Sequence, residues 1–234
     1  MAIPASCDLC SLGRHTPYSG LHGSVPAKIT RLRRELKSLP ARQVLFREGE
    51  VPSYACTLYS GWAFRYRMLS EGERHILSFY IPGDYLPLLG PSPGPLPFSV
   101  RALTDVELCV FDCEAMARAM MATEAARQDL FGAARDHSAG VERRFTDVAR
   151  RPALGRLAHL VLDLDSRVTL RGGKSDGAFL FPLRQDHLAD ALGLTAVHVN
   201  RTLAILRKEN VIRLERQTLG ILDPTRLRQL ASEG

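Results

Sequence analysis

The sequence lacks any long hydrophobic run. In 234 residues, no apolar stretch approaches the roughly 18 residues that a membrane-spanning helix needs. Residues 1–13 lack a basic start followed by an apolar stretch, so no export signal is predicted. We therefore expect a protein of the cytoplasm with no membrane partner.

Catalytic and metal-binding patterns are also missing. The chain has only five cysteines, and an odd number disfavours a disulfide framework. Its histidines show no paired metal-ligand spacing, and neither a Ser/His/Asp arrangement nor a phosphate-binding loop is present. We predict no metal site and no enzyme, with a thiol- or metal-dependent enzyme as the alternative that these absences disfavour.

Positive charge is in excess. The formal net charge is +6 and the isoelectric point is near 9.3, which favours an acidic partner such as nucleic acid. The segment from Thr195 to Arg228 holds only three acidic residues. Its seven basic residues are Arg201, Arg207, Lys208, Arg213, Arg216, Arg226 and Arg228. A second basic cluster, Lys28 to Lys37, is interpreted as the solvated face of a helix.

The first half of the sequence predicts an antiparallel β-roll. Residues 1–25, rich in Gly, Ser, Pro and Cys, are interpreted as an arm, and a short amphipathic helix is expected at Pro26–Leu39. Short β-type runs follow, separated by turns with glycine, and many short strands at such spacing indicate a barrel or roll over residues 26–112. These runs are Val44–Phe46, Cys56–Ser60, Trp62–Met68, His75–Tyr80, Val100–Leu103 and Val106–Phe111. The proline-rich stretch Pro87–Pro97 is expected to be a loop.

A helical period takes over in residues 113–151. Apolar or small residues recur at alternating steps of three and four, the spacing of a helix–helix seam: Phe131, Ala134, Ser138, Val141, Phe145 and Val148. Charged flanks and the helix-weakening Gly132 and Gly140 favour a partner helix, and so a homodimer, over packing on the chain's own domain. Arg151-Pro152 is expected to end the helix.

Residues 152–234 predict a winged helix-turn-helix. We expect a helix at Leu154–Val168, a strand at Phe179–Pro182, the two motif helices and a hairpin of Val211–Leu214 with Leu219–Leu222. Within the motif, Ala189 allows a close helix crossing, Gly193 permits positive φ in the turn, and Val199 packs the second helix onto the first. Leu188, Leu192, Leu203 and Leu206 are expected to fill the core.

Polar residues of the second motif helix are candidates for contact with double-stranded DNA. Thr195 is a natural N-cap, and His198, Asn200, Arg201 and Thr202 are expected to be exposed and to read base edges. Lys208, Arg207 and Arg213 would neutralise phosphates. The full predicted set is Arg184, Gln185, Thr195, His198, Asn200, Arg201, Thr202 and Lys208. The alternative for these residues is a solvated helix face. The alternative function is a small-molecule-responsive binding protein whose DNA domain has lost function, and a test of sequence-specific binding through Arg201 would distinguish it.

Together these segments resemble the Crp/Fnr family of bacterial transcription regulators, nearer its Fnr/FixK branch than its cyclic-AMP-binding branch. The resemblance covers about residues 26–230 and is carried by Leu45–Glu50, Leu58–Gly61, Ile81–Asp84, Ala189–Leu194 and Asn200-Arg201. It implies an α+β fold: an N-terminal jelly roll of the cyclic-nucleotide-binding kind, a long dimerisation helix and a C-terminal winged helix-turn-helix. A homodimer would bind a two-fold symmetric promoter site, with RNA polymerase as a partner if the protein activates. In the family's Glu-x-x-(Gly/Ser)-Arg motif, Arg201 matches the arginine, but Val197 replaces the glutamate and Asn200 the small residue.

The resemblance also bears on the effector. The family's cyclic-nucleotide pocket uses a glutamate and an Arg-Ser pair, and here Leu88 and Leu96-Pro97 stand in those places, so cyclic AMP is not expected. Oxygen-sensing members hold an iron–sulfur cluster on four cysteines. Cys7, Cys10 and Cys109 match three of these, but the other is missing near His15 and Thr16. We expect no cofactor, with a redox- or oxygen-responsive regulator using a cluster or a Cys7–Cys10 disulfide as the alternative.

Overall fold

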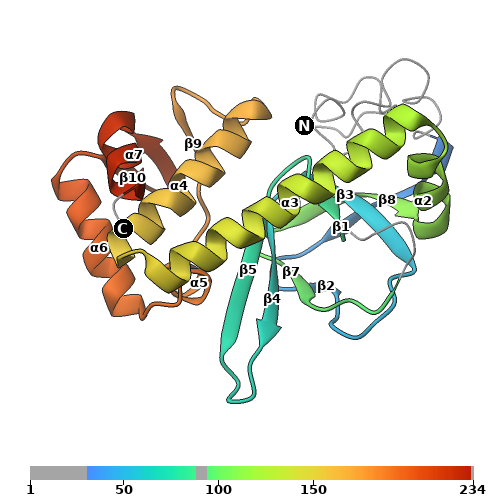
Figure 1. The fold of residues 1–234 in the computed structure, drawn as a ribbon, viewed down its shortest axis with the longest axis horizontal. Helices are drawn as coiled ribbons and strands as arrows, with labels where there is room; N and C mark the ends of the chain where they lie inside the picture. Colours follow the sequence, from blue (N-terminus) through green and yellow to red (C-terminus); the bar gives the residue numbers. More distant parts are fainter. Residues whose placement is uncertain (1–30, 88–93, 233–234) are drawn as a thin grey trace. The chain divides into compact units, whose positions relative to one another are not determined.

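The computed structural model describes residues 31–87 and 94–232 (Figure 1). The chain divides into two compact units. The first contains residues 31–67 and 77–138 of the described chain, and the second contains Met68–Ile76 together with Ala139–Gly234. The predicted arm of residues 1–25, with Cys7 and Cys10, lies outside the described residues, as does most of the predicted loop at Pro87–Pro97. In the part of the chain that is described, no helix is long and apolar enough to cross a bilayer.

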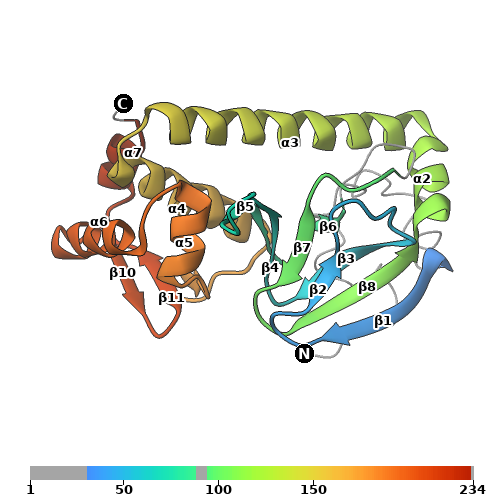
Figure 2. The ribbon, with the colours of Figure 1, turned by 90° about the horizontal axis from the view of Figure 1, so that it is seen from below.

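Two four-stranded antiparallel sheets form the β-roll, as predicted; only Met68 of β4 and the first three residues of β5 are counted with the second unit. One sheet has the order β1-β8-β3-β6, and the other the order β2-β7-β4-β5. Figure 2 shows β1, β8 and β3 side by side. The strands are β1 Arg33–Leu39, β2 Val44–Phe46, β3 Tyr54–Ser60, β4 Ala63–Met68, β5 Arg74–Tyr80, β6 Tyr85–Leu86, β7 Ser99–Ala102 and β8 Val106–Asp112. All six predicted β runs are present; β6 was not predicted.

Alternating side chains of β3 and β8 serve two separate cores. Cys56 and Leu58 point into the cluster between the sheets. Ala55 and Tyr59, one residue along, belong to a second cluster on the other face, as expected from the two-residue period of a strand. This second cluster holds Met116 and Leu130 from the helices that follow β8, and it therefore attaches those helices to the sheet.

The predicted helix at Pro26–Leu39 is wrong for its second half. Residues 33–39 form β1, which pairs antiparallel with β8 through partners such as Leu36 and Cys109. The helix was predicted from the helical spacing of Ile29, Leu32 and Leu36. Pairing with a strand about 70 residues later leaves no signal in local periodicity. The basic cluster that ends at Lys37 therefore lies, where it is described, largely on a strand.

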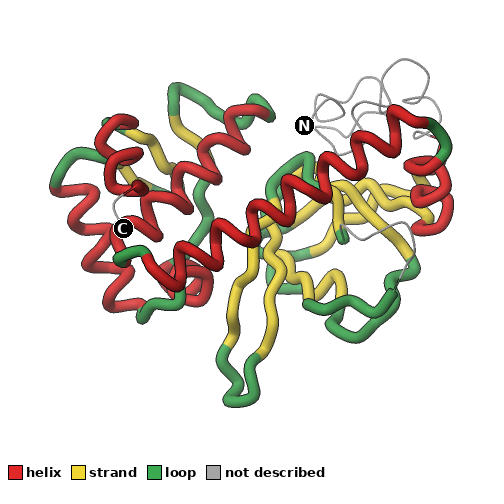
Figure 3. Tube along the Cα trace, viewed as in Figure 1, coloured by secondary structure: helices red, strands yellow, loops and turns green. Residues whose placement is uncertain are grey.

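Two helices occupy the region after β8, namely α2 at Cys113–Met121 and α3 at Glu124–Arg150. The hydroxyl oxygen of Thr123 accepts a hydrogen bond from the Ala126 N–H at 3.2 Å and begins α3. Figure 3 shows α3 as one continuous helix, 27 residues long. It ends just before Arg151-Pro152, which confirms the predicted end.

The second unit contains the predicted winged helix-turn-helix. Its elements are α4 Ala153–Leu170, β9 Ala178–Leu180, α5 Gln185–Leu192, α6 Ala196–Lys208, β10 Ile212–Glu215, β11 Thr218–Ile221 and α7 Pro224–Ser232. The three strands form a sheet of order β10-β11-β9, and β10 and β11 are the predicted hairpin. Helix α7, which was not predicted, packs against α4. Helix α5 ends at Gly193, whose φ of 63° lies in the left-handed region.

Two glycine-to-alanine changes should shift stability in opposite directions. Gly193→Ala should lower the free energy of unfolding by about 1–2 kcal/mol, because an alanine is strained at positive φ. Gly132→Ala should raise it by about 0.5–1 kcal/mol, since Gly132 lies inside α3 with open space where a Cβ would stand. Thermal unfolding followed by circular dichroism measures both changes. Equal destabilisation by the two changes would contradict the assigned backbone conformations.

Candidate nucleic-acid interface

The turn between α5 and α6 is held at both ends. Gly193 donates its N–H to the Ala189 carbonyl and closes α5. Thr195 is the N-cap of α6, as predicted, and its hydroxyl oxygen accepts the His198 N–H at 3.2 Å. From α4, Arg156 donates to the Leu192 carbonyl at 3.0 Å and to the Arg151 carbonyl at 2.8 Å. The arginine thereby fixes the end of α5, a role that sequence reasoning missed.

One face of α6 is buried, and its burial leaves the opposite face pointing to solvent. Val199, Leu203 and Leu206 are buried, as predicted, and they pack in the unit that also buries Leu188 and Leu192 of α5. In a helix, residues three and four apart share a face. The opposite face, exposed to solvent, therefore carries three of the polar candidates and two large apolar residues: His198, Asn200, Arg201, Val197 and Ile205.

Thr202 is not part of this exposed face, and its predicted exposure is wrong. It is 3% exposed, and its hydroxyl donates to the His198 carbonyl at 2.8 Å. A threonine can satisfy its hydroxyl within its own helix in this way, so it can occupy a core position next to Leu203. Its place three residues after Val199 could have indicated the buried side.

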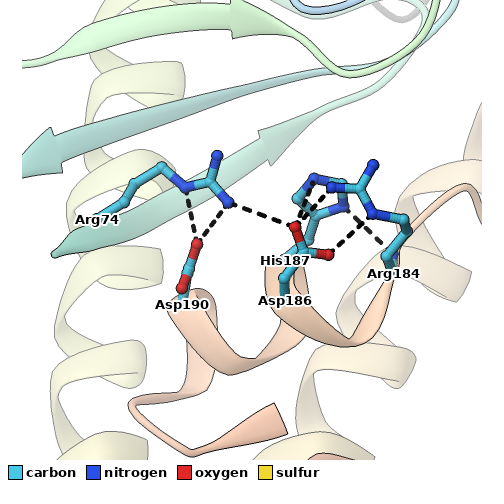
Figure 4. A network of polar contacts seen from close by, with 5 residues as sticks. All are labelled: Arg74, Arg184, Asp186, His187 and Asp190. Carbon is cyan, nitrogen blue, oxygen red and sulfur yellow. Dashed lines mark hydrogen bonds and ion pairs between the residues drawn. The ribbon is translucent and has the colours of Figure 1, made fainter.

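The N-terminus of α5 carries a network of ion pairs (Figure 4). Arg184 is exposed and makes two hydrogen bonds to Asp186, at 3.0 and 2.6 Å. Arg74, from the segment Met68–Ile76 of the same unit, binds Asp190 through Nε at 2.7 Å and lies 3.9 Å from Asp186. The predicted contact residues Arg184 and Gln185 are therefore at the exposed start of a helix whose acidic residues hold two arginines.

His187 lies buried inside this network, with 4% of its surface exposed. Its Nδ1 accepts the Arg184 backbone N–H at 3.2 Å, which requires the ring to be neutral at that nitrogen. Burial lowers the pKa of His187 to about 4; Asp186 and Asp190 oppose this shift, and Arg184 and Arg74 add to it. Neither the burial of His187 nor this network was predicted from the sequence.

Basic residues surround the exposed face of α6. Lys208, Arg207 and Arg213 are exposed, as expected for residues that contact phosphate. Arg207 also lines an open groove together with Arg184, Gln185 and Leu214. At the tip of the hairpin, Arg216 and Gln217 both have positive φ, of 46° and 65°, the backbone of a tight two-residue turn. The second unit thus presents cations on α5, α6 and the wing.

The cysteines of the β-roll do not form a metal site among the described residues. Cys109 is buried in the cluster beneath α2, whereas Cys56 points into the cluster between the sheets. Because they point to opposite faces, Cys56 cannot complete a ligand set with Cys109. Across residues 31–87 and 94–232, no group of three or more His, Cys, Asp or Glu is placed to bind a metal ion.

Both halves of the chain match known domain families. Residues 155–230 match the Crp-like helix-turn-helix domain, and residues 36–123 match the cyclic nucleotide-binding domain. The first match contains α5, α6 and the wing, and the second contains most of the β-roll. The order of the two domains agrees with the order predicted from the sequence.

Several proteins are similar to this one along most of the chain. The transcriptional activatory protein AadR of Rhodopseudomonas palustris is 30% identical over 82% of this chain and 79% of its own length. The nitrogen fixation regulation protein FixK of Bradyrhizobium diazoefficiens is 27% identical over 97% of this chain and 94% of its own. The structure of FixK2 from Bradyrhizobium japonicum superposes with a TM-score of 0.77 at 21% identity, covering 86% of this chain and 98% of that one.

Replacing His187 should make the protein more resistant to acid. Wild-type His187 is neutral when folded and takes up a proton below pH 6.5 when unfolded, so its stabilising effect is complete above that pH. The effect is lost as the pH falls towards about 4. His187→Asn keeps an acceptor for the Arg184 N–H but does not titrate. Relative to wild type, the variant should gain about 2 kcal/mol of unfolding free energy between pH 7.5 and pH 5 in urea titrations. A difference that does not change with pH would contradict the buried neutral histidine.

Proposed function

Because the chain belongs to the Crp/Fnr family of transcription regulators, in its Fnr/FixK branch, we propose that it binds a two-fold symmetric promoter site as a homodimer. Helix α6 enters the major groove of each half-site. The observation that carries this proposal is the division of α6 into a buried face, anchored by Val199, and an exposed face with Asn200 and Arg201.

Base recognition is assigned to the N-terminal half of α6. Arginine can bind guanine through two hydrogen bonds, and asparagine can bind adenine in the same way. Arg201 and Asn200 are exposed and adjacent, two turns or less from the N-cap Thr195. In helix-turn-helix proteins it is the first turns of the recognition helix that reach base edges. His198 faces the same side and supplies a further polar contact.

Phosphate contacts come from the cations that flank this surface. Lys208 and Arg207 at the end of α6, Arg213 on β10 and Arg184 and Gln185 at the start of α5 are exposed. Such residues position the protein on the duplex without reading its sequence. Of these, Arg184 already binds Asp186, so we assign it the weaker share of the phosphate binding.

Dimerisation is assigned to α3. Large apolar side chains of the predicted seam are exposed on this helix, with Phe131 at 61% and Phe145 at 76%. Val141 and Val148 continue the same stripe. Apolar residues at a repeat of three and four along a long helix are the pattern of a paired helix. A second copy of α3 would remove the stripe from water.

We propose that DNA binding requires no cyclic nucleotide. Leu96, which stands in the place of the family's phosphate-binding arginine, is 2% exposed and packs in the apolar core between the sheets. A leucine there offers no group to bind a phosphate.

The proposed site of action is the cytoplasm. Several relatives are named as activators, and an activating role would make RNA polymerase the protein partner.

Arg201→Ala should weaken binding to the selected operator by about 1–3 kcal/mol and relax the preference for one guanine in each half-site. Lys208→Ala, its matched control on the same helix, should weaken binding to all sequences alike and flatten the dependence of affinity on salt. Selection from a random duplex library, followed by titrations at several salt concentrations, measures both. Unchanged sequence preference in Arg201→Ala would exclude α6 as the recognition helix.

Val141→Glu should disrupt the dimer. In a paired α3 the two new carboxylates would face each other in an apolar seam, at a cost of several kcal/mol. Thr146→Glu places the same charge on α3 outside the stripe and should leave the dimer intact. Sedimentation velocity compares the two variants with the wild type. If Val141→Glu is as dimeric as Thr146→Glu, the interface lies elsewhere.

A further inference from the structure

The exposed face of α6 includes an aliphatic residue that the proposed contacts leave unexplained. Val197 is 63% exposed and lies in the first turn of α6, two residues after the N-cap Thr195. It stands three and four residues before Asn200 and Arg201, so the three side chains share one face of the helix. Any duplex that reaches Asn200 and Arg201 is therefore close to Val197.

The chemistry of valine restricts what it can recognise in the major groove. Its side chain has no hydrogen-bond donor or acceptor, so it cannot distinguish bases by their polar edges. The one apolar group that a base pair presents in the major groove is the 5-methyl group of thymine, which aliphatic side chains contact. A carboxylate at this position would instead accept a hydrogen bond from the N4 amino group of cytosine.

We propose that Val197 reads the 5-methyl group of a thymine and is a specificity-determining residue of this chain. The inference rests on the proposed function and deepens it by naming one base of the half-site. One turn of an α-helix advances about 5.4 Å, and successive nucleotides of one strand are about 3.4 Å apart. The thymine is therefore expected within about two base pairs of the guanine that Arg201 reads.

Val197 can be replaced without harm to the fold because its side chain is not part of the core. Val199, two residues later, is fully buried and supports α6, whereas Val197 is exposed. Changes at exposed positions usually leave stability almost unchanged. Variants of Val197 should therefore fold as the wild type does, and their effects can be assigned to the DNA.

The test removes the methyl group from the DNA and the valine from the protein in a double-mutant cycle. The wild-type operator is first selected from a random duplex library. Each thymine of a half-site is then replaced in turn by uracil, which differs only in lacking the 5-methyl group. At one position near the guanine, wild-type affinity should fall about fourfold, the ratio expected for one buried methyl-sized group. In Val197→Ala the same replacement should have almost no effect.

Two further arms sharpen the assignment. Ile205→Ala removes another exposed apolar side chain, two turns further along α6, and should keep the full uracil effect. The wild type should bind an operator with 5-methylcytosine at the identified position about fourfold more tightly than one with cytosine, because the two operators differ only in the methyl group. Library selection with Val197→Glu should replace the thymine by cytosine.

The inference is overturned if no uracil replacement weakens wild-type binding, or if the effect persists unchanged in Val197→Ala. Failure of the proposed function would look different: the wild type would select no sequence, or Arg201→Ala would leave the selected sequence unaltered. A selected operator that depends on Arg201 but not on the thymine methyl group would therefore refute this inference alone.

Discussion

The geometry of the proposed DNA-reading surface depends on the burial of one face of α6. Val199, Leu203 and Leu206 lie in the core with the hydroxyl of Thr202 satisfied inside the helix. Because a helix places side chains at fixed angular steps, anchoring these residues decides that Asn200 and Arg201 point outward. The left-handed Gly193 and the clamp by Arg156 then set how α6 follows α5. Recognition residues need no packing of their own, and so they can change while the scaffold stays the same.

The sequence predicted those parts of the fold that leave a local signature. Runs of β-type residues and the turns between them located six strands of the roll, and the spacing of Ala189, Gly193 and Val199 located the motif. Strand β1 was taken for a helix because its partner β8 is remote in sequence. Helix α7 was not predicted because it is only nine residues long, too few turns for its helical period to stand out.

The candidate site was predicted less completely than the fold, for related reasons. The N-cap at Thr195 and the exposure of Asn200 and Arg201 could be predicted because both follow from position in a helix. Thr202 was misplaced, since a polar side chain was assumed to face water although its own helix can satisfy it. Arg156, Arg74 and His187 act through partners that are distant along the chain or hidden by burial. Such contacts have no sequence signal without the three-dimensional structure.

The exposed phenylalanines of α3 have a consequence for how DNA occupancy depends on the concentration of the protein. If α3 pairs with a second copy, as proposed, DNA occupancy depends on the concentration of the dimer. Below the dissociation constant of the dimer, that concentration varies as the square of the monomer concentration, so halving synthesis lowers the DNA-competent population about fourfold. Under the proposed dimerisation, the amount of protein that is made would by itself set a sharp threshold for DNA binding.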